Sequence, residues 1–173
     1  KIVDQFQCYV RPMPNDRIQQ AAMNVHKLSL EFLNKNGLDA EGACEQFVDW
    51  MSKYIDINDR TTYTYQHRAW VKGWRVHFDM MFLQMFFEKL DRKDFFMYFR
   101  SHAWDIATRF LELYEDHLDM IPQHLHLKEA LQFVQAVVPA GLTFHNAIDD
   151  LTCTRILEAR IKELEAFKPK TGK

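Results

Sequence analysis

The sequence has little glycine, proline or cysteine, and each shortage excludes a class of protein. Five Gly and five Pro among 173 residues are too few for collagen-like repeats or for extended disorder. The three cysteines, Cys8, Cys44 and Cys153, stand far apart without a CxxC spacing. Neither a disulfide framework nor a cysteine zinc site is therefore expected, and we interpret the three as free thiols in a reducing compartment.

A basic excess and a long apolar run are also absent. The formal net charge is −2, whereas a protein that binds nucleic acid mainly by neutralising phosphates usually carries a positive excess. RNA remains an allowed partner that this charge disfavours. The most apolar stretch, Met80 to Phe87, is far shorter than the roughly 18 residues that identify a membrane-spanning helix. The sequence thus predicts no membrane insertion.

What the sequence does have is a hydrophobic fraction of 47% and strong helical periodicity. A chain of this length can bury a self-sufficient core. Apolar residues recur every three or four positions through most of the chain, and no run of β-branched residues alternates with period two, so we predict helices and no sheet. The predicted fold class is all-α, with eight or nine helices in stacked antiparallel hairpins.

Turn and cap residues set the expected boundaries. We predict an N-terminal arm over residues 1–14, one helical-hairpin domain over residues 15–168 and a basic tail over residues 169–173. Helices are expected to begin after Asn15-Asp16, after Asp39, at Thr61 or Thr62, at Val76, at Phe95, at Asp105, at Leu127 and after Thr143. The first of these should run unbroken to Asn36, the third to Val71, and the fifth from Phe95 to Ala103.

Several segments resemble the helices of pentatricopeptide (PPR) repeats. Residues 62–73 (TYTYQHRAWVKG) and residues 142–151 (LTFHNAIDDL) are similar to the first helix of such a repeat. Residues 43–51, 130–137 and 158–164 are similar to second helices, with a small Ala at the hairpin contact. The resemblance implies a right-handed α-α superhelix. Residues 95–141 depart from the pattern, because the two first-helix segments are not separated by a whole number of repeats.

PPR proteins bind single-stranded RNA, one base per repeat, and on that pattern Tyr65 and Asn146 occupy base-facing positions. In size and layout the chain also resembles the PPR-type accessory subunits of the F1 sector of euglenozoan mitochondrial ATP synthases. That resemblance implies a non-catalytic subunit that binds the ATP synthase α and β chains and needs no cofactor. The chain begins at Lys1 without an initiator Met, so we expect a cleaved presequence and the mitochondrial matrix. The alternatives are an organellar RNA-binding PPR module and a small-molecule-sensing helical domain.

Catalytic patterns are scarce. The sequence contains no P-loop, no GxSxG elbow and no Glu-x-x-His pair for a di-iron site. Asp149 and Asp150 near His145 have the residue types for general acid–base chemistry. Adjacent acids on a helix point in different directions, however, and one normally faces solvent. We therefore predict no catalytic, cofactor or metal site, and no enzyme activity of this chain itself.

Aromatic residues crowd the segment from residue 82 to residue 99. Two helices cannot bury this many rings on their inward faces, and exposed apolar patches usually mark partner surfaces. The candidate contacts with a protein partner are Phe86, Phe87, Phe95, Phe96 and Phe99.

Overall fold

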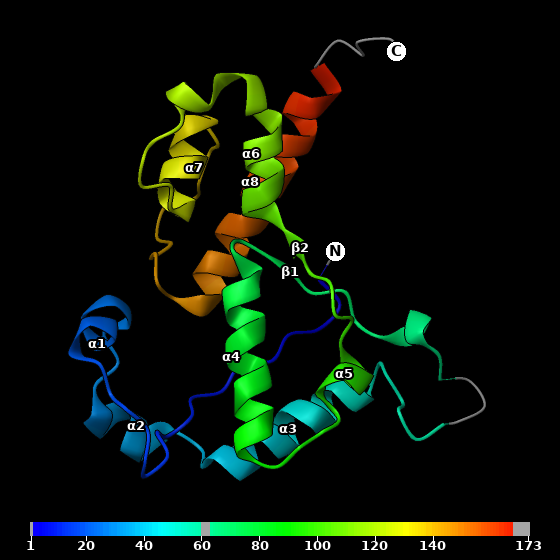
Figure 1. Cartoon of the computed structure of the whole chain (residues 1–173). Helices are drawn as coiled ribbons and strands as arrows, with labels where there is room; N and C mark the ends of the chain where they lie inside the picture. The colour runs from blue at the N-terminus through cyan, green and yellow to red at the C-terminus, as the bar shows by residue number, and fades with distance from the viewer. Residues whose placement is uncertain (1, 60–62, 168–173) are drawn as a thin grey trace. The chain divides into compact units, whose positions relative to one another are not determined.

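The computed structural model describes residues 2–59 and 63–167, and most of these residues are helical (Figure 1). The α-helices are α1 (Gln20–His26), α2 (Leu30–Asn36), α3 (Ala40–Ser52), α4 (Val76–Lys89), α5 (Phe95–Tyr98), α6 (Ile106–Leu113), α7 (Leu127–Phe133) and α8 (Ala147–Phe167). Two 3-10 turns, η1 (Tyr65–His67) and η2 (Glu115–Met120), and two strands, β1 (Lys72–Gly73) and β2 (Trp104–Asp105), complete the described elements. No helix in this part of the chain has the length and apolarity needed to cross a membrane.

The predicted helical class is confirmed, but the prediction that the chain has no sheet is wrong. β1 and β2 pair in parallel, with Lys72 opposite Trp104 and Gly73 opposite Asp105. Each strand has only two residues, too few to show a period-two pattern. A regular solenoid of stacked hairpins is not confirmed.

Backbone pairing also replaces two predicted helices. The predicted start at Thr61 or Thr62 lies outside the described residues, and from there the chain forms only the short turn η1. Beyond it, the Ala69 amide donates to the Tyr98 carbonyl at 2.8 Å, and the Arg100 amide donates to the Ala69 carbonyl at 3.1 Å. Because these groups bond across two segments, neither segment can use them inside a helix. The helix predicted from Phe95 to Ala103 accordingly ends at Tyr98.

The single helix predicted up to Asn36 is divided into α1 and α2. Lys27 ends α1 in the left-handed conformation, with φ 56°. Ser29 then begins α2, because its hydroxyl oxygen accepts the Phe32 amide at 3.1 Å. The predicted cap at Asp39 is confirmed: its carboxylate accepts the Gly42 amide at 2.8 Å and begins α3.

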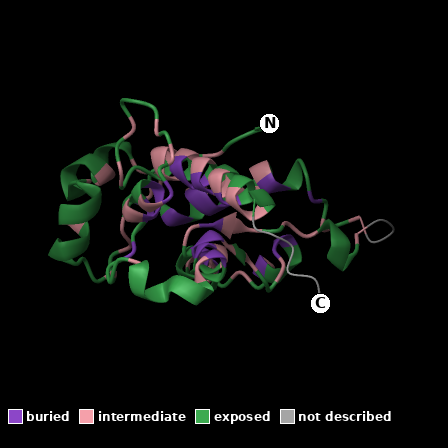
Figure 2. Ribbon diagram, turned by 90° about the horizontal axis from the view of Figure 1, so that it is seen from above, coloured by how far each residue is buried: buried purple, intermediate pink, exposed green. Residues whose placement is uncertain are grey.

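The chain divides into two compact units. The first unit comprises the residues up to Trp70 together with Met80–His102. Its core is aromatic: the Phe47 ring lies 6.3 Å from the Phe87 ring, edge to face, and is stacked at 6.1 Å on the Phe99 ring. Figure 2 shows buried, intermediate and exposed residues interspersed on several of the helices. The division does not test the predicted domain boundaries, and the tail residues 169–173 lie outside the described chain.

The second unit comprises Val71–Asp79 and the chain from Ala103 onward. Its core forms where α6 and α7 each pack against α8. The residues with no exposed surface in this core are Phe110, Ala130, Leu157 and Ile161. Cys153 is also buried there, and all three cysteines are free.

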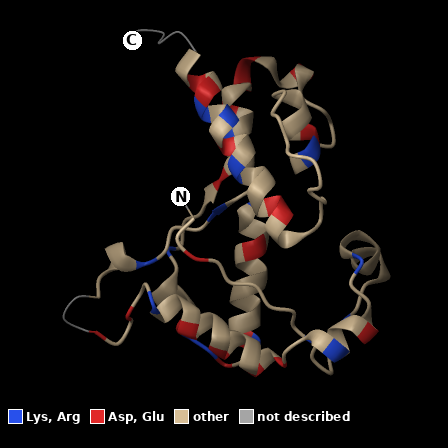
Figure 3. Cartoon of the chain, turned by 180° about the vertical axis from the view of Figure 1, so that it is seen from behind, with Lys and Arg blue, Asp and Glu red and all other residues tan. Residues whose placement is uncertain are grey.

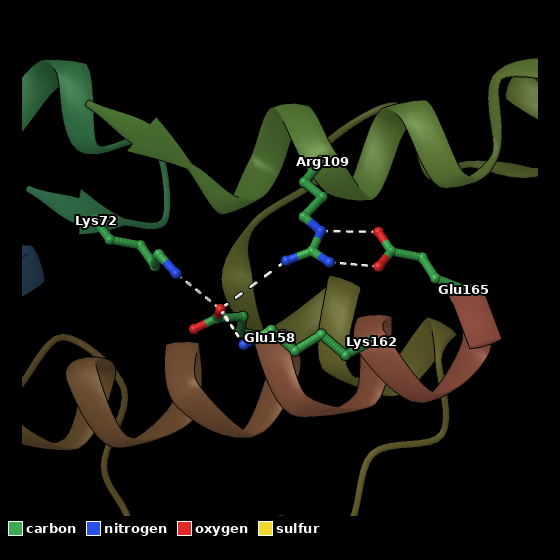
Figure 4. Close-up of polar contacts among 5 residues, drawn as sticks. All are labelled: Lys72, Arg109, Glu158, Lys162 and Glu165. Atoms are coloured by element: carbon green, nitrogen blue, oxygen red, sulfur yellow. Dashed lines mark hydrogen bonds and ion pairs between the residues drawn. The ribbon is translucent and has the colours of Figure 1, made fainter. Parts of the chain in front are cut away.

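An ionic cluster joins β1, α6 and α8 in the second unit (Figure 4). Glu158 on α8 accepts from Lys72 at 2.8 Å and from Lys162 at 2.7 Å, and Arg109 lies 3.9 Å away. Arg109 also forms a two-point contact with Glu165. Burial alone would raise the pKa of Glu158, but the hydrogen bonds from Lys162 and Lys72 outweigh burial and lower it. The cluster therefore fixes β1 and α6 against α8.

Candidate functional site

Two aspartates of the second unit have raised pKa values, which is unusual for their positions. Asp79 lies in the first turn of α4, and Asp150 lies in the first turn of α8. The positive end of a helix normally stabilises the ionised carboxylate there and lowers its pKa. A pKa shifted upward against this effect is a mark of candidate functional residues.

A second carboxylate, Asp105, contributes to the raised pKa of Asp79. The Asp79 side chain reaches solvent, yet the protein atoms around the carboxyl group remove enough water to raise its pKa. A bond from its own backbone amide partly offsets this, and the negative charge of Asp105 raises the pKa further. Asp105 is held in place because it accepts the backbone amides of Arg75 and Ala107, each at 2.8 Å.

Asp150 is paired with a histidine. Desolvation raises its pKa, while the His145 amide, which donates to its carboxylate at 3.3 Å, and the charge of the imidazole lower it. The neighbouring charge of Asp149 raises it again. The imidazole of His145 is exposed, so a ligand can approach the pair from solvent.

The segment before α8 folds back onto the first turn of that helix. The Asn146 side-chain oxygen accepts the amides of Ile148 at 3.1 Å and Asp149 at 3.3 Å. Asn146, rather than the predicted Thr143, is thus the cap of α8. Thr143 instead donates its backbone amide to Asp149 at 3.0 Å. Asp149 and Asp150 both point back toward the loop, which the prediction of one solvent-facing acid missed.

Both helices are preceded by a residue in the left-handed conformation. Arg75, just before α4, has φ 51°, and His145, just before the Asn146 cap, has φ 70°. Non-glycine residues adopt this conformation at a cost, and such residues are enriched at functional sites. In each case a carboxylate of the pair accepts the backbone amide of the left-handed residue, Asp105 from Arg75 and Asp150 from His145.

The two pairs provide acid–base groups within one compact unit. The pKa of each aspartate is raised above its ordinary value, and His145 lies beside one of them. Asp79 and Asp150 belong to separate pairs, each with its own partner. Among the residues that the structure describes, no three His, Cys, Asp or Glu side chains gather closely enough to bind a metal ion.

A comparison with known proteins bears on the chemistry of these groups. No protein-family model matches the sequence. The chain is 26% identical over 146 residues to the 3'-5' DNA exonuclease Cap18 of Escherichia coli, in an alignment that covers 84% of this chain and 68% of that protein. This chain is similar to a nuclease. The aligned length takes in most of both units.

This similarity overturns the functional predictions drawn from the PPR resemblance. The expected PPR-type subunit of the mitochondrial ATP synthase is contradicted, as is the expectation of a non-catalytic chain that is not an enzyme. Those predictions rested on short degenerate segments, and in one of them, residues 63–73, the structure shows only the short turn η1 and the strand β1 in place of a helix. The predicted matrix location and the predicted protein partners lose the resemblance that supported them, although no finding tests either.

The structure places the predicted RNA-contacting residues in different surroundings. Tyr65 lies in η1 with 45% of its surface exposed. Asn146 uses its side-chain oxygen to cap α8, so that oxygen is already engaged.

The predicted partner-contact aromatics are mostly internal. Phe87, Phe95 and Phe99 are at most 5% exposed in the first unit, and Phe86 is half-buried. Phe96 is 44% exposed, although its ring still contacts that of Phe95 at 5.0 Å. Of the five, Phe96 presents the most surface for a partner.

Asp79 is the candidate that sequence reasoning missed. Its one signal in the sequence is an acidic residue within the otherwise apolar run from Phe78 to Leu83. Asp105 gave a weaker signal, since it was recognised only as the start of a helix. Its proximity to Asp79 depends on the parallel pairing of β1 and β2, which brings the ends of both strands together.

Proposed function

We propose that this chain is part of a DNA-hydrolysing enzyme that removes nucleotides from the 3' end of a strand. The observation that carries the proposal is the similarity to the 3'-5' DNA exonuclease Cap18 over 84% of this chain. The paired carboxylates of the second unit supply the residue types that such a reaction uses.

In the proposed reaction a water oxygen attacks the phosphorus of the terminal phosphodiester. One phosphorus–oxygen bond breaks, the water loses a proton, and the leaving oxygen gains one. Asp150 and His145 are the groups proposed to accept and return these protons, since they lie together at the solvent-facing start of α8. Asp79, whose pKa is raised by burial and further by the negative charge of Asp105, is proposed as the second carboxylate of the site.

Metal ions assist many nucleases by stabilising the attacking and leaving oxygens. The described residues do not gather the three donors that would form a metal site. The roles assigned above are those of the protein's own side chains.

The finer prediction of stacked antiparallel hairpins stays a proposal for the arrangement of helices inside each unit. It is supported only by the packing of α6 and α7 against α8 in the second unit. The nuclease proposal does not depend on it.

The test is degradation of a single-stranded DNA oligonucleotide carrying a fluorescent label at its 5' end. The wild-type chain is expected to produce a ladder of labelled fragments that shortens from the 3' end. Asp79→Asn and Asp150→Asn should each slow this by at least roughly 100-fold, because a positioned acid or base typically contributes 10²–10⁴ in rate.

Asp116→Asn is the matched control. This exposed aspartate lies on η2 in the same unit and has no assigned role, so its rate should stay within about twofold of wild type. Wild-type rates in both Asp79→Asn and Asp150→Asn would refute the site. Release of the 5' label as the first product would refute the direction of degradation.

A further inference from the structure

The first unit contains a cluster of arginine and aromatic side chains that the proposed reaction does not use. This arginine–aromatic cluster consists of Tyr63, Tyr65, Arg68, Trp70 and Arg100. The guanidinium carbon of Arg100 lies 4.3 Å from the centre of the Trp70 ring and 4.9 Å from that of the Tyr65 ring. Arg68 lies 5.1 Å from the Tyr65 ring and 5.8 Å from the Tyr63 ring.

Backbone pairing and hydrogen bonds hold the cluster together. The bridge between Ala69 and Phe99 places Arg68 and Arg100 on adjacent segments. Arg100 donates to the carbonyls of Arg68 at 3.3 Å and Gln66 at 2.9 Å, which ties it to η1. Arg68 in turn donates to the Tyr63 hydroxyl at 2.9 Å. The positions of the planar groups are therefore built into the fold.

Within the described part of the chain, the cluster carries positive charge without a neutralising acid. Among the described residues, no carboxylate lies within salt-bridge distance of Arg68 or Arg100, whereas Arg92 and Arg109 both have such a partner. The hydrogen-bond acceptors that Arg68 and Arg100 do have are neutral oxygens. Two cations held side by side repel one another, and an anionic ligand relieves that repulsion.

Two rings of the cluster are open to solvent. Tyr65 is 45% exposed and Trp70 is 49% exposed, while both arginines are close to the surface. Exposed aromatic rings beside arginines are the combination with which proteins bind single-stranded nucleic acid: bases stack on the rings, and guanidinium groups contact phosphates. The net charge of −2 is no obstacle, because such binding needs only a local positive surface.

We propose that the arginine–aromatic cluster binds single-stranded DNA, with a base stacked on Tyr65 and backbone phosphates against Arg68 and Arg100. Only the choice of DNA over RNA rests on the proposed function. Binding at the first unit requires no hydrolysis, so the two proposals can fail separately.

The test measures the affinity of the full chain for fluorescein-labelled dT12 by fluorescence anisotropy. Phosphorothioate linkages in the oligonucleotide keep it intact during the measurement. Tyr65→Leu should weaken binding about tenfold, which corresponds to about 1.4 kcal/mol and lies within the range for one base stacked on an aromatic residue. Phe96→Leu, at an exposed aromatic of the same unit, should change the affinity less than twofold.

The arginines are tested through the salt dependence. In Arg68→Gln/Arg100→Gln, the slope of log K against log salt should become shallower by roughly 0.7 for each phosphate that the variant no longer neutralises. Thermal melting of each variant establishes that it is folded. Tyr65→Leu keeps the bonds from Arg100 to backbone carbonyls and the bond from Arg68 to the Tyr63 hydroxyl, so it tests the cluster even if the arginine variant unfolds.

Three results would overturn the proposal. The first is absence of wild-type binding, and the second is equal loss of affinity in Tyr65→Leu and Phe96→Leu. The third is equal affinity for a 12-base-pair duplex, whose bases are already stacked and cannot occupy Tyr65. The binding proposal and the nuclease proposal can be told apart. If the variants bind as expected but no ladder appears in the degradation assay, DNA binding by the cluster is supported and the proposed nuclease activity is refuted.

Discussion

Three carboxylates of the second unit have shifted pKa values, and the shifts differ in sign. Glu158 has three cations within 4 Å, so its ionised form is stabilised in the folded state. Asp79 and Asp150 have raised pKa values, so folding opposes their ionisation. Glu158 contributes to stability at neutral pH, whereas the two aspartates reduce it, as expected for groups retained for chemistry.

Replacement of Glu158 should destabilise the second unit. Glu158→Gln removes the charge that neutralises Lys72 and Lys162, and only 14% of the Glu158 side chain is exposed. We expect the free energy of unfolding to fall by about 2 kcal/mol, as for other hydrogen bonds to charged groups, with urea denaturation as the measurement. Glu163 forms an exposed ion pair with Arg160 on the same helix, so Glu163→Gln should lower the free energy of unfolding by less than about 0.5 kcal/mol.

The contribution of Glu158 to the free energy of unfolding should depend on pH. Because folding lowers its pKa, Glu158 contributes stability above the unfolded pKa of about 4.3, and this contribution is lost as the pH falls through the folded pKa. The difference in the free energy of unfolding between wild type and Glu158→Gln should therefore be at its largest at pH 7 and shrink below about pH 4. A difference that does not change over this range would show that packing rather than charge is responsible.

At the scale of elements, the helix starts connect the fold to the candidate site. The Asn146 cap fixes the loop that brings His145 beside Asp150. The Asp105 cap of α6 similarly brings a negative charge close to Asp79. These polar side chains stabilise helix ends and position charges at the same time.

Loss of the Asn146 cap should therefore lower both stability and activity. Asn146→Ala leaves the amides of Ile148 and Asp149 without their acceptor. We expect a loss of about 1 kcal/mol in the free energy of unfolding, measured in urea. Asn146→Ser keeps an acceptor at the cap and should recover most of both properties. If the serine variant is as impaired as the alanine variant, Asn146 acts by something other than capping.

On the scale of the whole molecule, the hydrophobic residues form a separate core in each unit. The core of the second unit consists mainly of aliphatic side chains on α6, α7 and α8, and that of the first is dominated by phenylalanine. Basic and acidic side chains are interspersed along the helices rather than separated (Figure 3). Nucleic-acid binding by such a surface must depend on local groups, because the chain as a whole offers no strong positive field.

A cavity in one core should unfold that unit more than the other. Leu157 on α8 has no exposed surface, and Leu157→Ala should lower the free energy of unfolding by about 3 kcal/mol. Hydrogen exchange followed by mass spectrometry should show faster exchange in α6, α7 and α8, with α3 much less affected. Leu151→Ala is the control. Leu151 lies on α8 and is 55% exposed, so this variant should change the hydrogen-exchange rates little. Equal acceleration in α3 and α8 would show that the two units unfold together.

The sequence by itself determined the helical class, because helical periodicity and cap residues such as Asp39 are local properties. It also contained the combination of His145 with Asp150, although the orientation of the two acids at that helix start could not be derived from spacing alone. Only the tertiary structure decided that residues 68–73 are extended, since their hydrogen-bond partners lie about thirty positions further along the chain. The same pairing brings Asp105 to Asp79, and Arg100 to Tyr65 and Trp70. The approach of Asp105 to Asp79 and the arginine–aromatic cluster thus depend on contacts between distant segments, which no local pattern specifies.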